Sequence, residues 1–302
     1  MFKLKPETIG TIFILLGNIL YGAFIVIVNQ TTKQIQPLFF ASISVLIASL
    51  TTLVYAFYKG KLKELKIRKS YYPILMTTLF IVIIPFTLFF IGASKTSGIN
   101  SSLLLLSEII FTVIITPFFG ETTSLYKILG AGGIFLGAIF ILYNNNFKIN
   151  IGDILIILST LTFPLGNFYA KKALNLVSSE IILFIRFLLG GLVIGTLSLM
   201  FEPTNLIKNS IVNHWPIILL NGILLLSVSK MFYYEALKRM DISKTISLGM
   251  TFPIYSLLIL TIFFKEEITP YKWIGIAVML IGVYFTIKRK SVDPKLTKYA
   301  HN

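Results

Sequence analysis

Two charged residues stand deep within apolar stretches of the sequence, where a charge could do chemistry. Glu108 lies about ten residues, or roughly 15 Å of helix, from one end of its stretch, and Lys230 lies about seven residues, or roughly 10 Å, from the end of its own. A charge at the centre of a membrane helix costs about 2.5–3.5 kcal/mol, so each charge needs a reason. Glu108 and Lys230 could share a polar cavity that binds substrate or couples protons. Alternatively, they could form an ion pair that only locks two helices.

Two further charges lie nearer the ends of their stretches. Arg186 is about six residues, or roughly 9 Å, from an end, within reach of lipid headgroups. Glu235 is almost at an end and could reach the headgroups or pair with Lys238. We expect a structural role for both Arg186 and Glu235.

Neutral hydrogen-bonding groups occur at similar depth. Some of them would join helices to one another, and the others would line a substrate pathway. The candidates for the pathway, beside Glu108 and Lys230, are Asn18, Tyr21, Thr87, Asn167, Tyr234 and Tyr255.

Enzyme chemistry finds little support in the residues. The two histidines, His214 and His301, lie at or beyond the ends of apolar stretches, and the chain has no cysteine. There is no paired aspartate motif for a metal–pyrophosphate group and no phosphate-binding glycine loop. We therefore expect no catalytic residues, no metal and no cofactor.

The composition places the chain in a bilayer. Hydrophobic residues make up 56% of its 302 residues and charged residues 13%, with a mean hydropathy of +0.86. A soluble domain carries about 25% charged residues, and one this apolar would aggregate. The net charge of +15 comes mainly from lysines in a few loops, so we expect no nucleic-acid binding.

Long apolar stretches predict an all-α membrane protein, because about 20 residues cross the hydrocarbon and backbone groups in lipid must bond within a helix. We predict ten spans: 9–28, 38–57, 74–91, 99–119, 126–143, 153–174, 181–201, 215–237, 242–264 and 270–287. With the N-terminus inside, the inner segments carry twenty Lys and Arg residues and the outer loops six. The excess of basic residues predicts that both termini are cytoplasmic, in a multi-pass protein of the plasma membrane.

The sequence repeats itself after 145 residues. Positions 118–140 match positions 263–285 at eight of twenty-three places without a gap, including Glu121 with Glu266 and Gly137 with Gly282. Each unit then holds five helices, and an odd number inverts the second unit in the membrane. We predict two inverted repeats, over residues 1–145 and 146–290, and a cytoplasmic tail over 291–302. Transporters of this kind bind substrate at the repeat interface near the midplane.

The segments that carry the repeat resemble a known family. Residues 98–137 (GINSSLLLLSEIIFTVIITPFFGETTSLYKILGAGGIFLG) and 234–282 look like the second halves of EamA repeats of the drug/metabolite transporter superfamily. Tyr21-Gly22 stands where that family usually has Trp-Gly, while Glu108 replaces a usual proline. The resemblance implies a ten-helix fold around a central cavity and the transport, often outward, of small metabolites such as amino acids.

Together these observations predict a secondary transporter that moves a small polar or amphipathic metabolite by alternating access. The mixed charge of Glu108 against Lys230 and Arg186 slightly favours a zwitterion. A channel and a membrane-embedded enzyme for a lipid-linked substrate are the alternatives. The partners we expect are the substrate, membrane lipids and, as one option for coupling, protons. The residues leave open whether the chain works as a monomer or a homodimer.

Overall fold

The computed structural model describes residues 5–119, 124–142, 150–237, 239 and 248–287, and every regular element in these ranges is helical. Eight helices are long and apolar enough to cross a membrane: Pro6–Thr31, Pro37–Tyr58, Arg68–Ala93, Gly98–Phe119, Leu125–Leu142, Ile151–Leu174, Ser179–Phe201 and Asn209–Ala236. Two shorter apolar helices follow, over Phe252–Phe263 and Pro270–Phe285. The prediction of an all-α, multi-pass membrane protein is therefore confirmed.

Several of the long helices are divided into shorter elements, while α1 (Pro6–Thr31), α2 (Pro37–Tyr58), α7 (Leu125–Leu142) and α10 (Ser179–Phe201) are continuous. The third long helix consists of α3 (Tyr71–Thr78), the π-helical η3 (Leu79–Ile83) and α4 (Ile84–Ala93), and the fourth consists of α5 (Gly98–Leu104), the 3₁₀ turn η4 (Leu105–Ser107), α6 (Glu108–Ile115) and the 3₁₀ turn η5 (Thr116–Phe119). The sixth is divided into α8 (Ile151–Thr160) and α9 (Phe163–Leu174). The eighth consists of α11 (Ile207–Leu219), the π-helical η7 (Leu220–Val228) and α12 (Ser229–Leu237). The chain closes with α14 (Phe252–Phe263) and α15 (Pro270–Ile287). Short 3₁₀ turns lie before α3, over Leu62–Lys66 (η1) and Arg68–Ser70 (η2), and before α11, over Thr204–Leu206 (η6).

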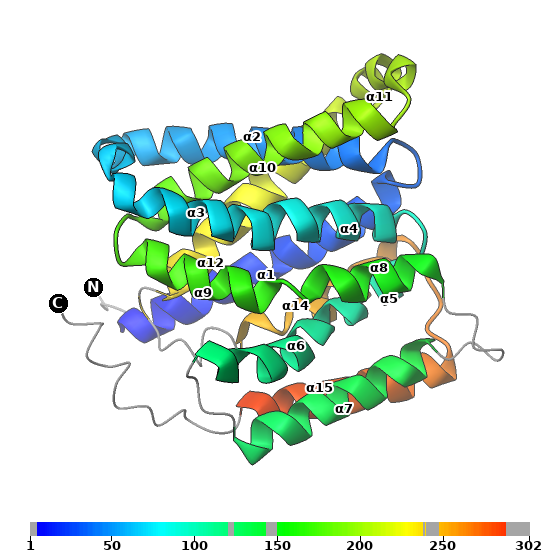
Figure 1. The fold of residues 1–302 in the computed structure, drawn as a ribbon. Helices are drawn as coiled ribbons and strands as arrows, with labels where there is room; N and C mark the ends of the chain where they lie inside the picture. Colours follow the sequence, from blue (N-terminus) through cyan, green and yellow to red (C-terminus); the bar gives the residue numbers. More distant parts are fainter. Residues whose placement is uncertain (1–4, 120–123, 143–149, 238, 240–247, 288–302) are drawn as a thin grey trace.

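Helix α1 runs through the middle of the bundle and packs on α12, α14, α4 and α5 (Figure 1). Its side chain Phe24 is almost fully buried and contacts the rings of Phe86, Phe89 and Phe90, with centroids 6.1–6.4 Å apart. Aromatic pairs at such distances add to the free energy of burial. The aromatic core therefore fixes α1 against α4.

Helices α2 and α10 lie side by side and run in opposite directions. The hydroxyl of Ser42 donates to the carbonyl oxygen of Gly191 (2.8 Å), and that of Ser49 donates to the carbonyl oxygen of Phe184 (3.2 Å). The start of each of these two helices is bound by a glutamate that follows the end of its neighbour. The glutamate accepts hydrogen bonds from the free N–H groups of the helix start. The carboxylate of Glu202 accepts from the N–H groups of Leu38 and Phe39, both at 2.8 Å. Unpaired N–H groups at a helix start favour a bound carboxylate.

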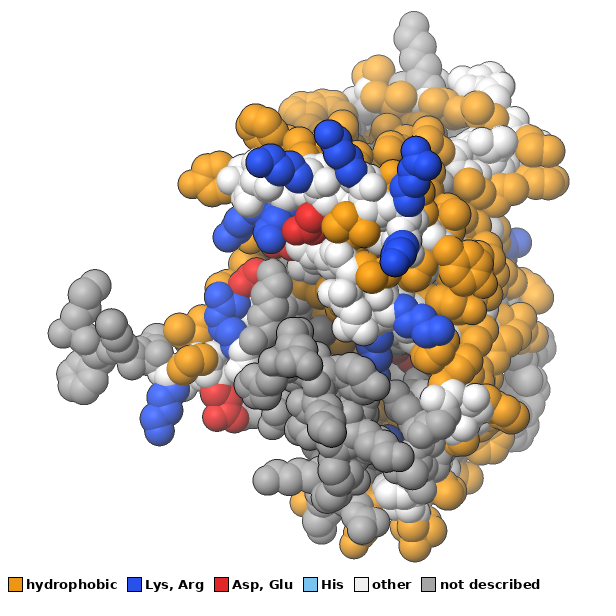
Figure 2. All heavy atoms as spheres, turned by 60° about the vertical axis from the view of Figure 1, so that its left-hand side comes forward, with side chains coloured by type: hydrophobic (Ala, Val, Ile, Leu, Met, Phe, Trp, Pro, Cys, Tyr) orange, Lys and Arg blue, Asp and Glu red, His pale blue; other side chains and the backbone are white. Residues whose placement is uncertain are grey.

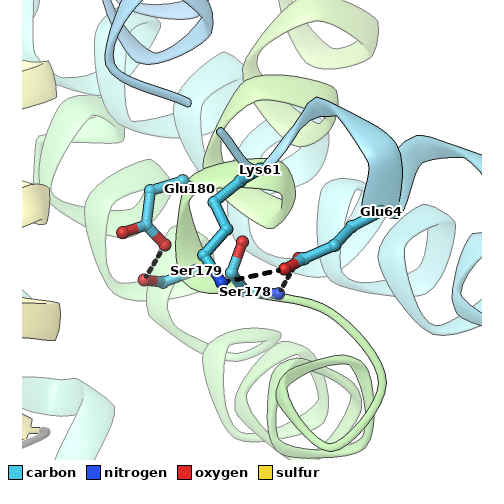
Figure 3. Close-up of polar contacts among 5 residues, drawn as sticks. All are labelled: Lys61, Glu64, Ser178, Ser179 and Glu180. Carbon is cyan, nitrogen blue, oxygen red and sulfur yellow. Dashed lines mark hydrogen bonds and ion pairs between the residues drawn. The ribbon is translucent and has the colours of Figure 1, made fainter. Parts of the chain in front are cut away.

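The second of these carboxylates is Glu64, shown in Figure 3. It accepts a hydrogen bond from the backbone N–H of Ser178 (2.6 Å) at the start of α10 and forms an ion pair with Lys61 (3.2 Å). Partial burial alone would raise the pKa of Glu64, but the hydrogen bonds from Ser178 and Lys61 outweigh it and hold the pKa below its ordinary value. The contact therefore favours the ionised carboxylate.

Helices α7 and α15 form a separate pair at one side of the molecule (Figure 1). Their contact depends on glycines: a Cβ on Gly137 would lie 2.7 Å from the carbonyl oxygen of Gly275, and one on Gly282 would lie 2.7 Å from that of Gly130. Since low numbers on α7 meet high numbers on α15, the two helices are antiparallel. Small residues allow membrane helices to approach closely, as expected of these glycines.

Candidate functional site

Glu108 is the first residue of α6, directly after the 3₁₀ turn η4, and its side chain is half-buried. Its carboxylate accepts a hydrogen bond from the amide of Asn167 (3.3 Å), which lies on α9. Helix α9 begins after a break at Leu161 and Thr162, where Pro164 occupies the first turn of the new helix. The helix that begins there, α9, packs on α6.

Lys230 is the second residue of α12, directly beyond the π segment η7, and its Nζ lies 3.6 Å from the centre of the Tyr21 ring. A cation over an aromatic face is stabilised by the ring quadrupole, and more so away from water. The Tyr21 ring is itself fixed by stacking on Phe24 (5.7 Å) and by an edge contact with Phe252 (5.1 Å). The aromatic core therefore holds the Tyr21 ring in place beneath the Lys230 ammonium.

Arg186 on α10 is 4% exposed. Its guanidinium lies 5.0 Å from the ring centre of Phe187 and interacts with Tyr234, which is also buried. Its Nε has no hydrogen-bond partner among the described residues. Arg186 is thus buried rather than directed to the headgroups, and its snorkelling, which the sequence suggested, is not what the structure shows.

These residues form one group, which we call the central cluster and define as Tyr21, Glu108, Asn167, Arg186, Lys230 and Tyr234. Tyr21 interacts electrostatically with Glu108 and Arg186, and Glu108 interacts with Lys230. However, the described residues contain no ion pair within 4.0 Å between Glu108 and Lys230; the pairs there are Lys61–Glu64 and Arg239–Glu235. Glu108 and Lys230 therefore interact electrostatically without forming an ion pair.

The other candidates from the sequence lie outside the central cluster. Asn18 donates to Thr251 Oγ1 (2.9 Å) and to the carbonyl oxygen of Leu248 (2.5 Å), so it joins α1 to the segment before α14. The hydroxyl of Thr87 is buried and has no partner within the described ranges.

Two more candidates complete the set. Tyr255 packs near Gly22 and has no polar contact in the described part of the chain. Glu235 pairs with Arg239 (2.5 Å), whereas Lys238, the partner considered from the sequence, lies outside the described residues.

A polar network that the sequence reasoning missed lies at one end of the bundle, which we call the far end because it is opposite the start of α1 and the end of α15 (Figure 1). The amide of Asn29 donates to the carbonyl oxygens of Ala93 (2.7 Å) and Thr96 (3.1 Å). The hydroxyl of Thr96 donates to Asp153, which also accepts from Asn100 (3.0 Å). The network therefore ties α1 and the loop before α5 to α8.

Glu266 extends this network to the loop before α15. Its carboxylate accepts from the N–H groups of Gly98 (3.0 Å) and Ile99 (3.1 Å) at the start of α5, and from the amide of Gln30 (3.3 Å). The match of Glu121 with Glu266 in the repeat could have singled out Glu266 from the sequence. Glu121 itself lies outside the described residues.

The opposite end, where α1 begins and α15 ends (Figure 1), is strongly basic. Figure 2 shows blue side chains gathered on this face. The exposed basic residues of the segment after α2 and of the last turns of α9 are Lys59, Lys63, Lys66, Arg68, Lys69, Lys171 and Lys172. Membrane proteins keep such loops on the cytoplasmic side.

Comparison with known proteins decides the family. The model of the EamA-like transporter family matches residues 8–143 and again residues 150–288. The chain belongs to the EamA-like transporter family. Its two EamA matches confirm the family resemblance and the two-repeat architecture. The EamA family consists of membrane transporters, which agrees with the weak support for enzyme chemistry in the sequence.

The fold is shared with solved structures. One, named "Crystal structure of protein", superposes with a TM-score of 0.66 over 94% of this chain and 99% of that chain, at 15% sequence identity. At that identity the likeness concerns the fold alone. No curated protein matches the chain.

Proposed function

We propose that this EamA protein is a secondary transporter with ten spans in two inverted five-helix repeats. Helices α14 and α15 are then the ninth and tenth spans. The inversion is supported by the antiparallel packing of two pairs of equivalent helices, α2 with α10 and α7 with α15. The transported solute is a small polar or amphipathic metabolite, such as an amino acid.

The observation that carries this proposal is the position of the central cluster. Tyr21 and Glu108 come from the first family match, and Arg186 and Lys230 come from the second. Charged groups in the middle of membrane helices are costly and mark substrate or ion pathways. Inverted-repeat transporters bind their substrates at the interface between the repeats.

Alternating access needs one closed side and helices that can bend. The network around Asn29, Asp153 and Glu266 is the closed outer gate in this proposal. The π segments η3 and η7 lie in the third and eighth long helices, which are equivalent in the two repeats. Such segments occur at functional sites and at bends, so they supply the hinges.

The basic end then faces the cytoplasm, the protein lies in the plasma membrane, and the central cluster is loaded from inside. This orientation favours export. Glu108 is half-buried, and its hydrogen-bond partner among the described residues is a neutral amide, so Glu108 is the residue best placed to carry a coupling proton.

A two-step experiment tests the proposal. The purified full-length protein is first screened by thermal shift against a metabolite library, because a ligand of the folded state raises its apparent stability. Solutes that raise the melting temperature are then tested for counterflow in proteoliposomes. Accumulation of labelled solute driven by unlabelled solute supports a carrier. Leakage at equal rates without saturation or counterflow indicates a channel and contradicts the proposal.

A further inference from the structure

Two basic side chains in the central cluster form no ion pair with an acidic residue in the described part of the chain. Arg186 is 4% exposed and its Nε hydrogen has no acceptor among the described residues. The Nζ of Lys230 lies against the Tyr21 ring, and no carboxylate of a described residue lies within 4.0 Å of it. Buried polar groups are nearly always hydrogen-bonded, so an orphan donor on a buried guanidinium needs an explanation.

The charges of the cluster are also unequal. It contains two basic residues and one carboxylate, Glu108, whose hydrogen bond goes to the neutral Asn167. Lys230 interacts electrostatically with Arg186 as well as with Glu108. Like charges repel strongly in a low-dielectric interior. An anion near both Lys230 and Arg186 would remove this repulsion and occupy the free donor.

We propose that the transported solute carries a carboxylate, which Lys230 and Arg186 bind together. This inference rests on the proposed transport function and names the chemical class of its substrate. A guanidinium offers several donors in a planar arrangement that suits a carboxylate, and charge-assisted hydrogen bonds are stronger than neutral ones. The Tyr21 ring contacts the ammonium of Lys230 and helps to position it.

The same arrangement disfavours a purely cationic solute. A cation near Glu108 would also meet the field of two basic residues, because Lys230 interacts electrostatically with Glu108 and Arg186 interacts with Tyr21. A purely structural role for the bases would require acceptors within the protein. Within the described ranges, Tyr234 interacts with the Arg186 guanidinium, but the Nε of Arg186 has no acceptor and Lys230 has only an aromatic ring.

The test uses the full-length protein in detergent and two matched pairs of small probes, acetate with acetamide and benzoate with benzamide, at equal ionic strength adjusted with sodium chloride. The two members of a pair are close in size, but only the acid is charged. We expect a saturable rise in melting temperature with the carboxylates and none with the amides. We expect Lys230→Gln and Arg186→Gln to abolish the rise, and Lys63→Gln, on the exposed basic end, to keep it.

Two variants separate charge from packing. Lys230→Arg keeps the charge and is expected to keep the carboxylate-induced shift even where the Gln variant folds poorly. Glu108→Gln removes the only acid of the cluster and is expected to keep or increase the shift. The inference is overturned if neither carboxylate raises the melting temperature, if amides act equally, or if Lys63→Gln loses the shift as Lys230→Gln does.

Transport in proteoliposomes distinguishes the two proposals. If the protein transports the amides as fast as the matching acids, the proposed transport function is supported and the carboxylate preference is wrong. If carboxylates give a shift that depends on Lys230, yet no solute of any class shows counterflow, the anion site stands and the transport function is wrong.

Discussion

Gly137 and Gly275 face each other across the contact between α7 and α15, and each leaves no room for a side chain on the other. A Cβ on Gly137 would lie 2.7 Å from the carbonyl oxygen of Gly275, and a Cβ on Gly275 would lie 2.8 Å from that of Gly137. The repeat equates Gly137 with Gly282 and Gly275 with Gly130, which form the second close contact of the same helix pair. The two contacts are therefore equivalent, with the roles of α7 and α15 exchanged, as two inverted repeats require.

This contact predicts the effect of adding a methyl group. Gly137→Ala would place its Cβ 2.5 Å from Met279 and against the backbone of Gly275, so we expect a loss of about 1–3 kcal/mol. Gly132 on the same helix has open space, and Gly132→Ala should be neutral or stabilising by about 0.5–1 kcal/mol. Melting temperatures of the two variants check this prediction. Equal effects would contradict the close packing.

The hydrogen bonds of Glu64 predict a pH dependence. A carboxylate whose pKa is lowered on folding stabilises the protein above its unfolded pKa, about 4.3, and this contribution is lost as the pH falls through the lower folded pKa. We expect the wild type to melt above Glu64→Gln at neutral pH. The difference should shrink as the pH falls below about 4.3 and disappear below the lowered folded pKa. A difference that stays constant from neutral to acidic pH would show that Glu64 acts by packing alone.

The topology is testable because the chain has no cysteine. Single cysteines at positions 33, 148 and 208 should react with an impermeant thiol reagent added to intact cells, and those at positions 63 and 295 should not. Permeabilised cells provide the control that positions 63 and 295 can react at all. Labelling of position 63 in intact cells would contradict the predicted orientation and the assignment of the outer gate.

The aromatic support of Lys230 predicts a graded response at Tyr21. Tyr21→Phe keeps a ring beneath the ammonium and should preserve transport, whereas Tyr21→Leu removes it. A cation–π contact of about 0.5–2 kcal/mol corresponds to a rise in KM of roughly 2- to 30-fold. KM values for counterflow check this prediction, with the melting temperature as a control for folding. If Tyr21→Phe raises KM as much as Tyr21→Leu does, the Tyr21 hydroxyl, and not the ring, supports transport.

Much of the fold could be predicted from the sequence because hydrophobic length and the repeat are properties of the chain itself. The match of Gly130 and Gly137 with Gly275 and Gly282 identified the glycines that bring α7 and α15 together. The carboxylates that bind helix starts were missed. Glu202 lies in a loop and meets Leu38 only after α2 and α10 pack, so no local pattern reveals it.

The site could be predicted only in part. Depth in an apolar stretch was sufficient to single out Glu108 and Lys230, because a charge there is costly wherever the helix faces. Which partners they meet depends on helix rotation. The same limit applies to Asn18, which joins two helices, and to Arg186, which is buried although a side chain of its length could reach the headgroups.

The most direct test of the transport site is counterflow by the double variant Glu108→Leu with Lys230→Leu, in proteoliposomes and with the solute identified by thermal shift. A charge pair that only clamps helices can be exchanged for apolar side chains, and then the double variant should recover the activity that each single variant loses. Our account predicts that the double variant stays folded, judged by its melting temperature, and transports at least tenfold more slowly than the wild type. Transport at the wild-type rate by the double variant would contradict the account.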